Sequence, residues 1–179
     1  MLLADGRTHL TYCLNVHPAR TWPENLRAIR DYALRVRDAV GSGGPFGLGL
    51  RLSAAAAEEL DRPRTLADFR RFLDDEGLYV FTINGFPYGR FHGGAVKADV
   101  YRPDWRTEAR RDYTNRLATI LAELLPEGAV GSISTVPLAY RGSGGPNGAG
   151  GRADRPPPPA GDAPEPKETG KEEQPAFPM

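Results

Sequence analysis

The sequence has almost no cysteine, no excess of charge and no long apolar run, and each shortage excludes a class of protein. Cys13 is the one cysteine among 179 residues, so a secreted domain held by internal disulfides is excluded. The 23 basic and 23 acidic side chains cancel, which argues against a protein that grips a nucleic-acid backbone. No segment approaches the roughly 18 apolar residues of a membrane span, and residues 1–9 lack the apolar stretch of a signal peptide. We therefore expect a soluble cytoplasmic protein with no nucleic-acid partner and no transmembrane segment.

The composition changes near residue 140. Residues 141–179 contain 9 proline and 8 glycine residues and few apolar side chains. Such a segment buries too little apolar surface to offset the entropy lost on ordering. We predict a globular domain over residues 1–140, followed by a disordered Pro/Gly-rich tail over residues 141–179.

Strand and helix patterns alternate through the first 140 residues. Strands are predicted at 10–16, 46–52, 78–83 and 131–136 from their apolar and β-branched content. Helices are predicted from a capping box at Thr21 and Glu24, over 54–60, from Thr65 to a C-cap glycine at Gly77, and over about 113–124. This order predicts an α/β fold, either a doubly wound sheet or part of a (β/α)8 TIM barrel with about four βα units.

Two glycines in the second predicted strand point to a close approach. Gly47 and Gly49 alternate with Leu48 and Leu50, so both glycines lie on one face of the strand. We expect another backbone or a bound molecule to lie against that face.

In both architectures ligands bind at the carboxyl ends of the parallel strands. His17 follows the first strand and His92 lies in the long loop after the third. Both are candidate catalytic residues, able to exchange protons or to bind a divalent metal. The loop and strand ends also offer groups that can hydrogen-bond a polyol or phosphate, and the substrate-binding candidates are Asn15, Asn84, Tyr88 and Arg90. The alternative, that each histidine caps or fills a loop, stays open.

Other polar residues are assigned structural roles. Cys13 lies within a strand and is predicted to be a small buried apolar residue. His9 precedes the first strand, at the opposite edge of the sheet, and is predicted to be structural. The arginines at 106, 110, 111 and 116 alternate with acidic residues and are predicted to form a solvated helix face.

Four sequence blocks together resemble the metabolite traffic protein EboE family. They are Leu10–Pro18 (LTYCLNVHP), with Trp22 shortly after, Thr82–Gly93 (TINGFPYGRFHG), Val100–Trp105 (VYRPDW) and Gly131–Leu138 (GSISTVPL). The resemblance covers about residues 8 to 138. It implies a barrel of the xylose-isomerase-like type, similar to sugar isomerases and epimerases and associated with the traffic of secondary metabolites.

The resemblance implies a small polar metabolite as ligand, and it stops after Leu138. In the wider superfamily the carboxylate ligands of a divalent metal often come from later strands, which this chain does not show. One explanation is a truncated barrel, inactive alone, and we favour it. Another is a half-barrel that associates with a second copy or another chain to cover its open sheet edges. A non-catalytic metabolite-binding or interaction subunit is the alternative to an enzyme.

Overall fold

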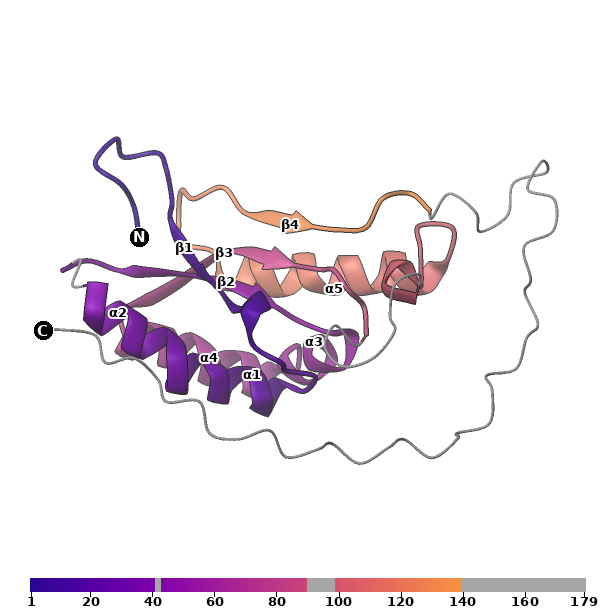
Figure 1. Ribbon diagram of the computed structural model, residues 1–179, viewed down its shortest axis with the longest axis horizontal. Helices are drawn as coiled ribbons and strands as arrows, with labels where there is room; N and C mark the ends of the chain where they lie inside the picture. The colour runs from indigo at the N-terminus through magenta and orange to yellow at the C-terminus, as the bar shows by residue number, and fades with distance from the viewer. Residues whose placement is uncertain (41–42, 90–98, 140–179) are drawn as a thin grey trace, which may run out of the picture. The chain divides into compact units, whose positions relative to one another are not determined.

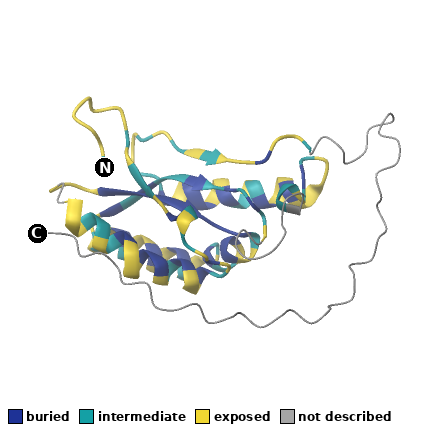
Figure 2. Cartoon of the chain, viewed as in Figure 1, coloured by how far each residue is buried: buried dark blue, intermediate teal, exposed yellow. Residues whose placement is uncertain are grey.

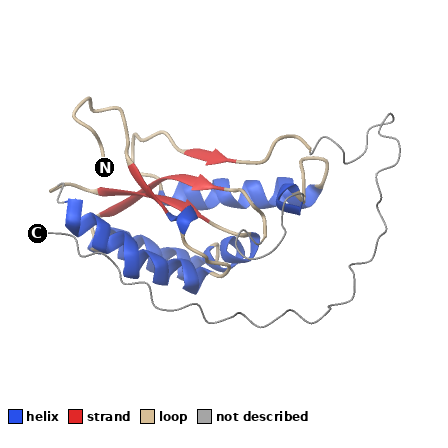
Figure 3. Cartoon of the chain, in the orientation of Figure 1, coloured by secondary structure: helices blue, strands red, loops and turns tan. Residues whose placement is uncertain are grey.

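The computed structural model describes residues 1–40, 43–89 and 99–139, all of which belong to one compact unit, Met1–Ser143. The fold is mixed α/β, as the sequence predicts, with one four-stranded sheet and its helices (Figures 1 and 3). The strands are β1 (Thr11–Cys13), β2 (Phe46–Arg51), β3 (Leu78–Asn84) and β4 (Ser132–Ser134). The tail predicted over residues 141–179 lies outside the described residues.

The sheet is parallel throughout, and its strand order is β1-β2-β3-β4, the order of the sequence. The pairing of β2 with β3 shifts register between Leu48 and Gly49, so Phe81 forms a bulge opposite them. Each pair of neighbouring strands is connected through helices, which is the connection that parallel strands require.

The helices follow from local signals in the sequence. The capping box at Thr21 and Glu24 forms as predicted and starts α1 (Trp22–Ala28), which continues through a π-helical segment, η2 (Ile29–Ala33), into α2 (Leu34–Val40). The other helices are α3 (Ala54–Leu60), α4 (Pro63–Asp75) and α5 (Glu108–Leu124), and η3 (Asp99–Tyr101) is a single 3-10 turn. None of the described helices is long and apolar enough to cross a lipid bilayer.

Several predicted boundaries differ from the structure: α5 begins at Glu108 rather than near residue 113, and β4 ends at Ser134 rather than at residue 136. Two further differences have a local reason. The strand predicted over 10–16 ends at Cys13, because Leu14–Val16 turn into a short 3-10 helix, η1, and place Leu14 in the core. The helix predicted from Thr65 begins two residues earlier at Pro63, which suits a first helical turn because proline has no N–H to satisfy.

The core lies between the helices and one face of the sheet (Figure 2). Leu48 and Leu50 from β2 and Val80 and Ile83 from β3 are fully buried there. They pack with helix residues that share an apolar face, namely Ile29, Ala33, Leu60, Phe69, Leu73, Leu117 and Ile120. Burial of these side chains accounts for most of the stabilisation of the described unit.

On the opposite face, the N-terminal segment crosses β2 at Gly47. A Cβ atom at Gly47 would lie 2.6 Å from the carbonyl oxygen of Leu10 and 2.7 Å from the amino nitrogen of Met1. The prediction of a close approach by another backbone is therefore confirmed at this glycine. At Gly49 the neighbours are the side chains of Thr11 and Thr82.

Cys13 does not have the environment predicted for it. Its side chain is exposed, because Tyr12 packs against the core and successive side chains of a strand point to opposite faces. His9 lies near the start of β3, where its Nδ1 is 2.9 Å from the hydroxyl of Tyr79.

Candidate functional site

Polar side chains meet where β2, β3 and β4 end. The register places Arg51 of β2 opposite Asn84 of β3, and Asn84 opposite Ser134 of β4. These three residues form a row across the carboxyl edge of the sheet, which is the edge where parallel α/β folds bind ligands. We define this row and the loops next to it as the carboxyl edge.

Asn84, a predicted substrate-binding residue, lies at the centre of the row. Its Oδ1 accepts a hydrogen bond from the Ser134 hydroxyl (3.0 Å) and another from the backbone N–H of Phe86 (2.9 Å). The N–H of Gly85 donates to the carbonyl of Ser134, which holds the two strand ends together. With Oδ1 engaged, the side-chain amide nitrogen has no hydrogen bond within the described part of the chain and can donate to a ligand.

His17 lies at the same edge but beside β1, two strands away from Asn84. Its Nε2 is 2.8 Å from the Tyr12 hydroxyl, and its ring stacks on Tyr32 with centroids 4.3 Å apart. Burial lowers the pKa of His17 below its usual value, so the ring is neutral at physiological pH. Asn15 lies in η1 at this edge, half-buried, with its side-chain oxygen shielded from solvent.

Tyr88 lies over the guanidinium of Arg110, with 5.7 Å between the ring centroid and Cζ. Its ring also meets Tyr113 edge to face at 5.0 Å, and its carbonyl accepts from the N–H of Ala54. Tyr88 is half-buried, whereas Tyr113 is buried. The structure thus brings Tyr88 to the carboxyl edge, while the predicted site residues Arg90 and His92 lie outside the described residues.

Arg51 is a buried member of the row that the sequence interpretation did not include among the site residues. It is 2% exposed, and it donates from Nη1 to the carbonyl of Ala19 (2.5 Å) and from Nη2 to that of Gly89 (3.1 Å). These contacts tie the loop after β1 and the loop after β3 to the end of β2. Burial lowers the pKa of Arg51, but a guanidinium stays protonated in proteins.

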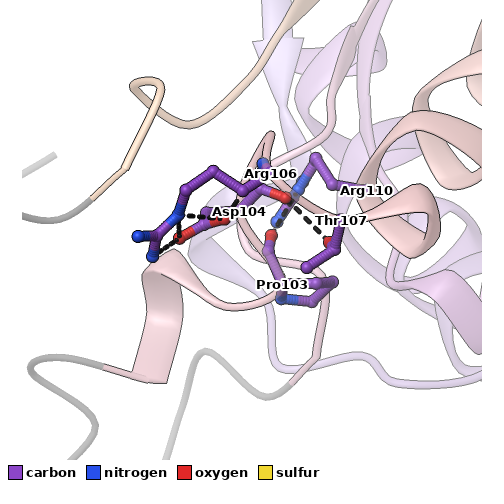
Figure 4. Close-up of polar contacts among 5 residues, drawn as sticks. All are labelled: Pro103, Asp104, Arg106, Thr107 and Arg110. Carbon is purple, nitrogen blue, oxygen red and sulfur yellow. Dashed lines mark hydrogen bonds and ion pairs between the residues drawn. The ribbon is translucent and has the colours of Figure 1, made fainter. Parts of the chain in front are cut away.

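Arg110 is the second buried arginine, and its predicted place on a solvated face is wrong. It is fully buried and donates from Nε to the carbonyl of Pro103 at 2.7 Å (Figure 4). Its Nη1 donates to the carbonyl of Gly85 at 2.9 Å. Burial lowers its pKa. Its spacing could have revealed this environment, because Arg110 stands three residues before Tyr113 and seven before Leu117, on the apolar face of α5.

The segment before α5 is fixed by its own polar contacts. Asp104 forms an ion pair with Arg106, with 2.5 Å between Oδ2 and Nη2, and this arginine lowers the pKa of the Asp104 carboxyl group (Figure 4). The hydroxyl of Thr107 donates to the carbonyl of Asp104. The indole N–H of Trp105 donates to the carbonyl of Val136, which holds this segment against the chain after β4.

A divalent metal has no ready site among these side chains. Nε2 of His17 is engaged by Tyr12, and the described residues contain no group of three or more histidine, cysteine or acidic side chains that could hold a metal ion. His92, the other predicted metal ligand, lies outside the described residues.

A cavity of about 900 Å³ lies at the opposite, amino edge of the sheet. Met1, His9, Tyr79 and the ends of α4 and α5 line it, and the ion pair between Arg70 and Glu123 at its margin is exposed. Ligand sites in parallel α/β folds lie at the carboxyl ends of strands. The carboxyl edge, with its buried charged groups, is therefore the better candidate despite the cavity at the amino edge.

Comparison of the sequence with models of protein families, with curated proteins and with solved structures found no match.

Proposed function

We propose that this chain binds a small polar metabolite at the carboxyl edge of its sheet. The observation that carries the proposal is the row of Arg51, Asn84 and Ser134, which the strand register aligns at one edge. Buried arginine donors fix the surrounding loops, so the edge is preorganised before a ligand arrives. The amide of Asn84 and the hydroxyl of Ser134 are groups that hydrogen-bond polyols.

We also propose that the sheet is half of a (β/α)8 barrel of the xylose-isomerase-like type. A doubly wound sheet reverses its strand order and carries helices on both faces. Here the order is sequential, and the face away from the core meets the N-terminal segment at Gly47. Sequential parallel strands are the pattern of a barrel, whose full complement is eight. The resemblance of four sequence blocks to the EboE family is a second support.

We further propose an isomerase or epimerase activity, in which His17 and His92 exchange protons with the sugar. Isomerisation of a sugar by proton transfer requires a base in its unprotonated form, and burial of His17 favours the unprotonated imidazole. The contact of His17 with Tyr12 favours the second candidate function, a non-catalytic metabolite-binding subunit, because it occupies one of the two ring nitrogens.

Within the described residues β1 and β4 each pair with one strand only, and their outer edges support self-association with a second copy. The three residues of β1 and the three of β4 carry no charge, although exposed edge strands are usually protected by charged residues or proline. Leu10 and Val16 flank β1 with 55% and 66% of their surface exposed, and Val130 and Leu138 flank β4 with 87% and 73% exposed. A two-fold axis parallel to the strands would set β4 of each copy beside β1 of the other, giving eight parallel strands.

Binding is tested by NMR titration of the full chain with ribose, ribitol and hexoses. We expect shifts of the backbone amides of Asn84, Gly85 and Ser134, and weaker binding in Asn84→Asp, which keeps Oδ1 but removes the amide donor. Asn115→Asp, on the exposed face of α5, is the matched control. Equal affinity of Asn84→Asp and the unaltered chain for these sugars would contradict the proposal, as would amide shifts confined to residues of the amino edge.

Turnover separates the two candidate functions. An enzyme converts the sugar into its isomer or epimer, and if His17 or His92 transfers the proton, deuterium from heavy water enters the product. A carrier saturates with ligand and leaves it unlabelled.

A further inference from the structure

Arg110 has a donor group that the described chain leaves unused. Two of its three nitrogens donate to backbone carbonyls, those of Pro103 and Gly85, as Figure 4 shows for the first. Nη2 is buried and has no hydrogen-bond partner among the described residues. A buried N–H group without a partner is unfavourable, and more so on a charged side chain. The environment of Arg110 is therefore incomplete without a further acceptor.

The charge of Arg110 is also not balanced by an ion pair within the described residues. The contacts of its guanidinium are two neutral carbonyls and two aromatic rings, Tyr88 at 5.7 Å and Tyr113 at 5.3 Å. Asp104, six residues before it, is the acidic group whose charge acts on Arg110, but its carboxylate accepts hydrogen bonds of 3.1, 3.1 and 2.5 Å from the Arg106 side chain. An acceptor that is itself negatively charged fits this setting best.

We propose that Arg110 forms an oxyanion subsite of the carboxyl edge, where Nη2 binds an oxygen of a carboxylate or phosphate group on the metabolite. The proposal rests on the proposed function and names the ligand class, a polyol that carries one oxyanion. The Gly85 carbonyl that Arg110 holds directly follows Asn84. A ligand whose hydroxyl groups meet Asn84 therefore has its charged end within reach of the guanidinium.

Tyr88 covers the solvent side of this subsite. Of the two rings beside the guanidinium, Tyr113 is buried in the core and Tyr88 is half-buried. Tyr88 is the ring that can move without opening the core, so an oxyanion that reaches Nη2 displaces the ring of Tyr88. Ligand binding should therefore change the environment of Tyr88 more than that of Tyr113, whose hydroxyl stays bound to the carbonyl of Leu52.

The test compares ribose, ribonate, ribose 5-phosphate and inorganic phosphate on the full chain by calorimetry and NMR. A charge-assisted hydrogen bond is worth roughly tenfold to a hundredfold in affinity, so ribonate or ribose 5-phosphate should bind more tightly than ribose by about that factor. Which of the two gains more identifies the source of the oxyanion. Arg110→Gln should abolish the gain, whereas Arg111→Gln, on the exposed side of the same helix, should keep it.

Arg110→Gln also removes two loop contacts, so a measurement on the unaltered chain accompanies it. The side-chain N–H resonances of Arg110 and the ring resonances of Tyr88 should shift when ribonate or ribose 5-phosphate is added. Equal binding of ribose and its charged derivatives, with Arg110 unshifted, would overturn the oxyanion subsite and leave the proposed function standing. Absence of binding by all the sugars would overturn both, and binding of inorganic phosphate away from Arg110 would overturn the subsite.

Discussion

The hydroxyl of Tyr12 lies 2.8 Å from Nε2 of His17, while the ring of Tyr32 stacks on the same imidazole. Two tyrosines thus enclose a histidine at the end of β1, and burial lowers its pKa. Protonation of this ring is less favourable in the folded protein than in the unfolded chain, so the stability of the fold depends on pH.

We predict that acidification from about pH 7.5 to about pH 5.5 destabilises the chain through His17. The unfolded chain protonates this histidine near pH 6.5, above the folded pKa, so the free energy of unfolding falls as the pH drops through that window. Urea unfolding should show a smaller fall in His17→Gln than in the unaltered chain. An equal fall in both would contradict the prediction. Asp5 does not interfere, because hydrogen bonds from Thr8 and Arg7 lower its pKa to about 2.

A second prediction concerns the hydroxyl of Tyr113, which donates to the carbonyl of Leu52 at 2.5 Å. Tyr113→Phe leaves that carbonyl without its partner in a buried setting, and we expect a loss of about 1–3 kcal/mol in the free energy of unfolding. Tyr32→Phe, whose side chain is half exposed, should change it by less than about 0.5 kcal/mol. Equal effects of the two substitutions in urea unfolding would show that the Tyr113 contact contributes nothing.

The alternation of strands and helices could be predicted from the sequence because it depends on local signals. Thr21 and Glu24 stand three residues apart and cap each other across one turn, and Gly77 ends α4 with a positive φ. Gly47 has no side chain, which predicted that another backbone or a bound molecule lies close to it. The two caps act within a few residues of the chain, whereas the segment that approaches Gly47, which contains Met1 and Leu10, is distant in sequence and could not be named from it.

The composition of the carboxyl edge was only half predictable, because it depends on contacts between distant residues. Asn84 and Tyr88 follow a clear strand and were expected there. Arg51 and Arg110 are buried by loops that lie 32 and 25 residues away along the chain, at Ala19 and Gly85. Charged residues are expected at the surface by default, and only the tertiary structure supplies the carbonyls that allow their burial.

A third prediction uses Gly47. In Gly47→Ala the new methyl group would lie where the Met1 amino group and the Leu10 carbonyl now are. The N-terminal segment must move, and we expect a loss of about 1–3 kcal/mol in the free energy of unfolding. Hydrogen exchange at the amide of Leu10, which donates to Met1, should become faster. Gly44→Ala, where a Cβ has no neighbour within 4 Å, is the control. Unchanged exchange at Leu10 would contradict the close approach.

The last prediction tests self-association. If two copies close their sheets against each other, sedimentation should give the mass of two chains. Val130→Lys should shift the equilibrium to monomer, because it buries an ammonium group beside the β4 edge, and an unpaired buried charge strongly opposes association. Val40→Lys is the matched control, since Val40 is also exposed but lies at the end of α2. A chain that stays monomeric at high concentration, or two lysine variants that behave alike, would contradict closure by a second copy.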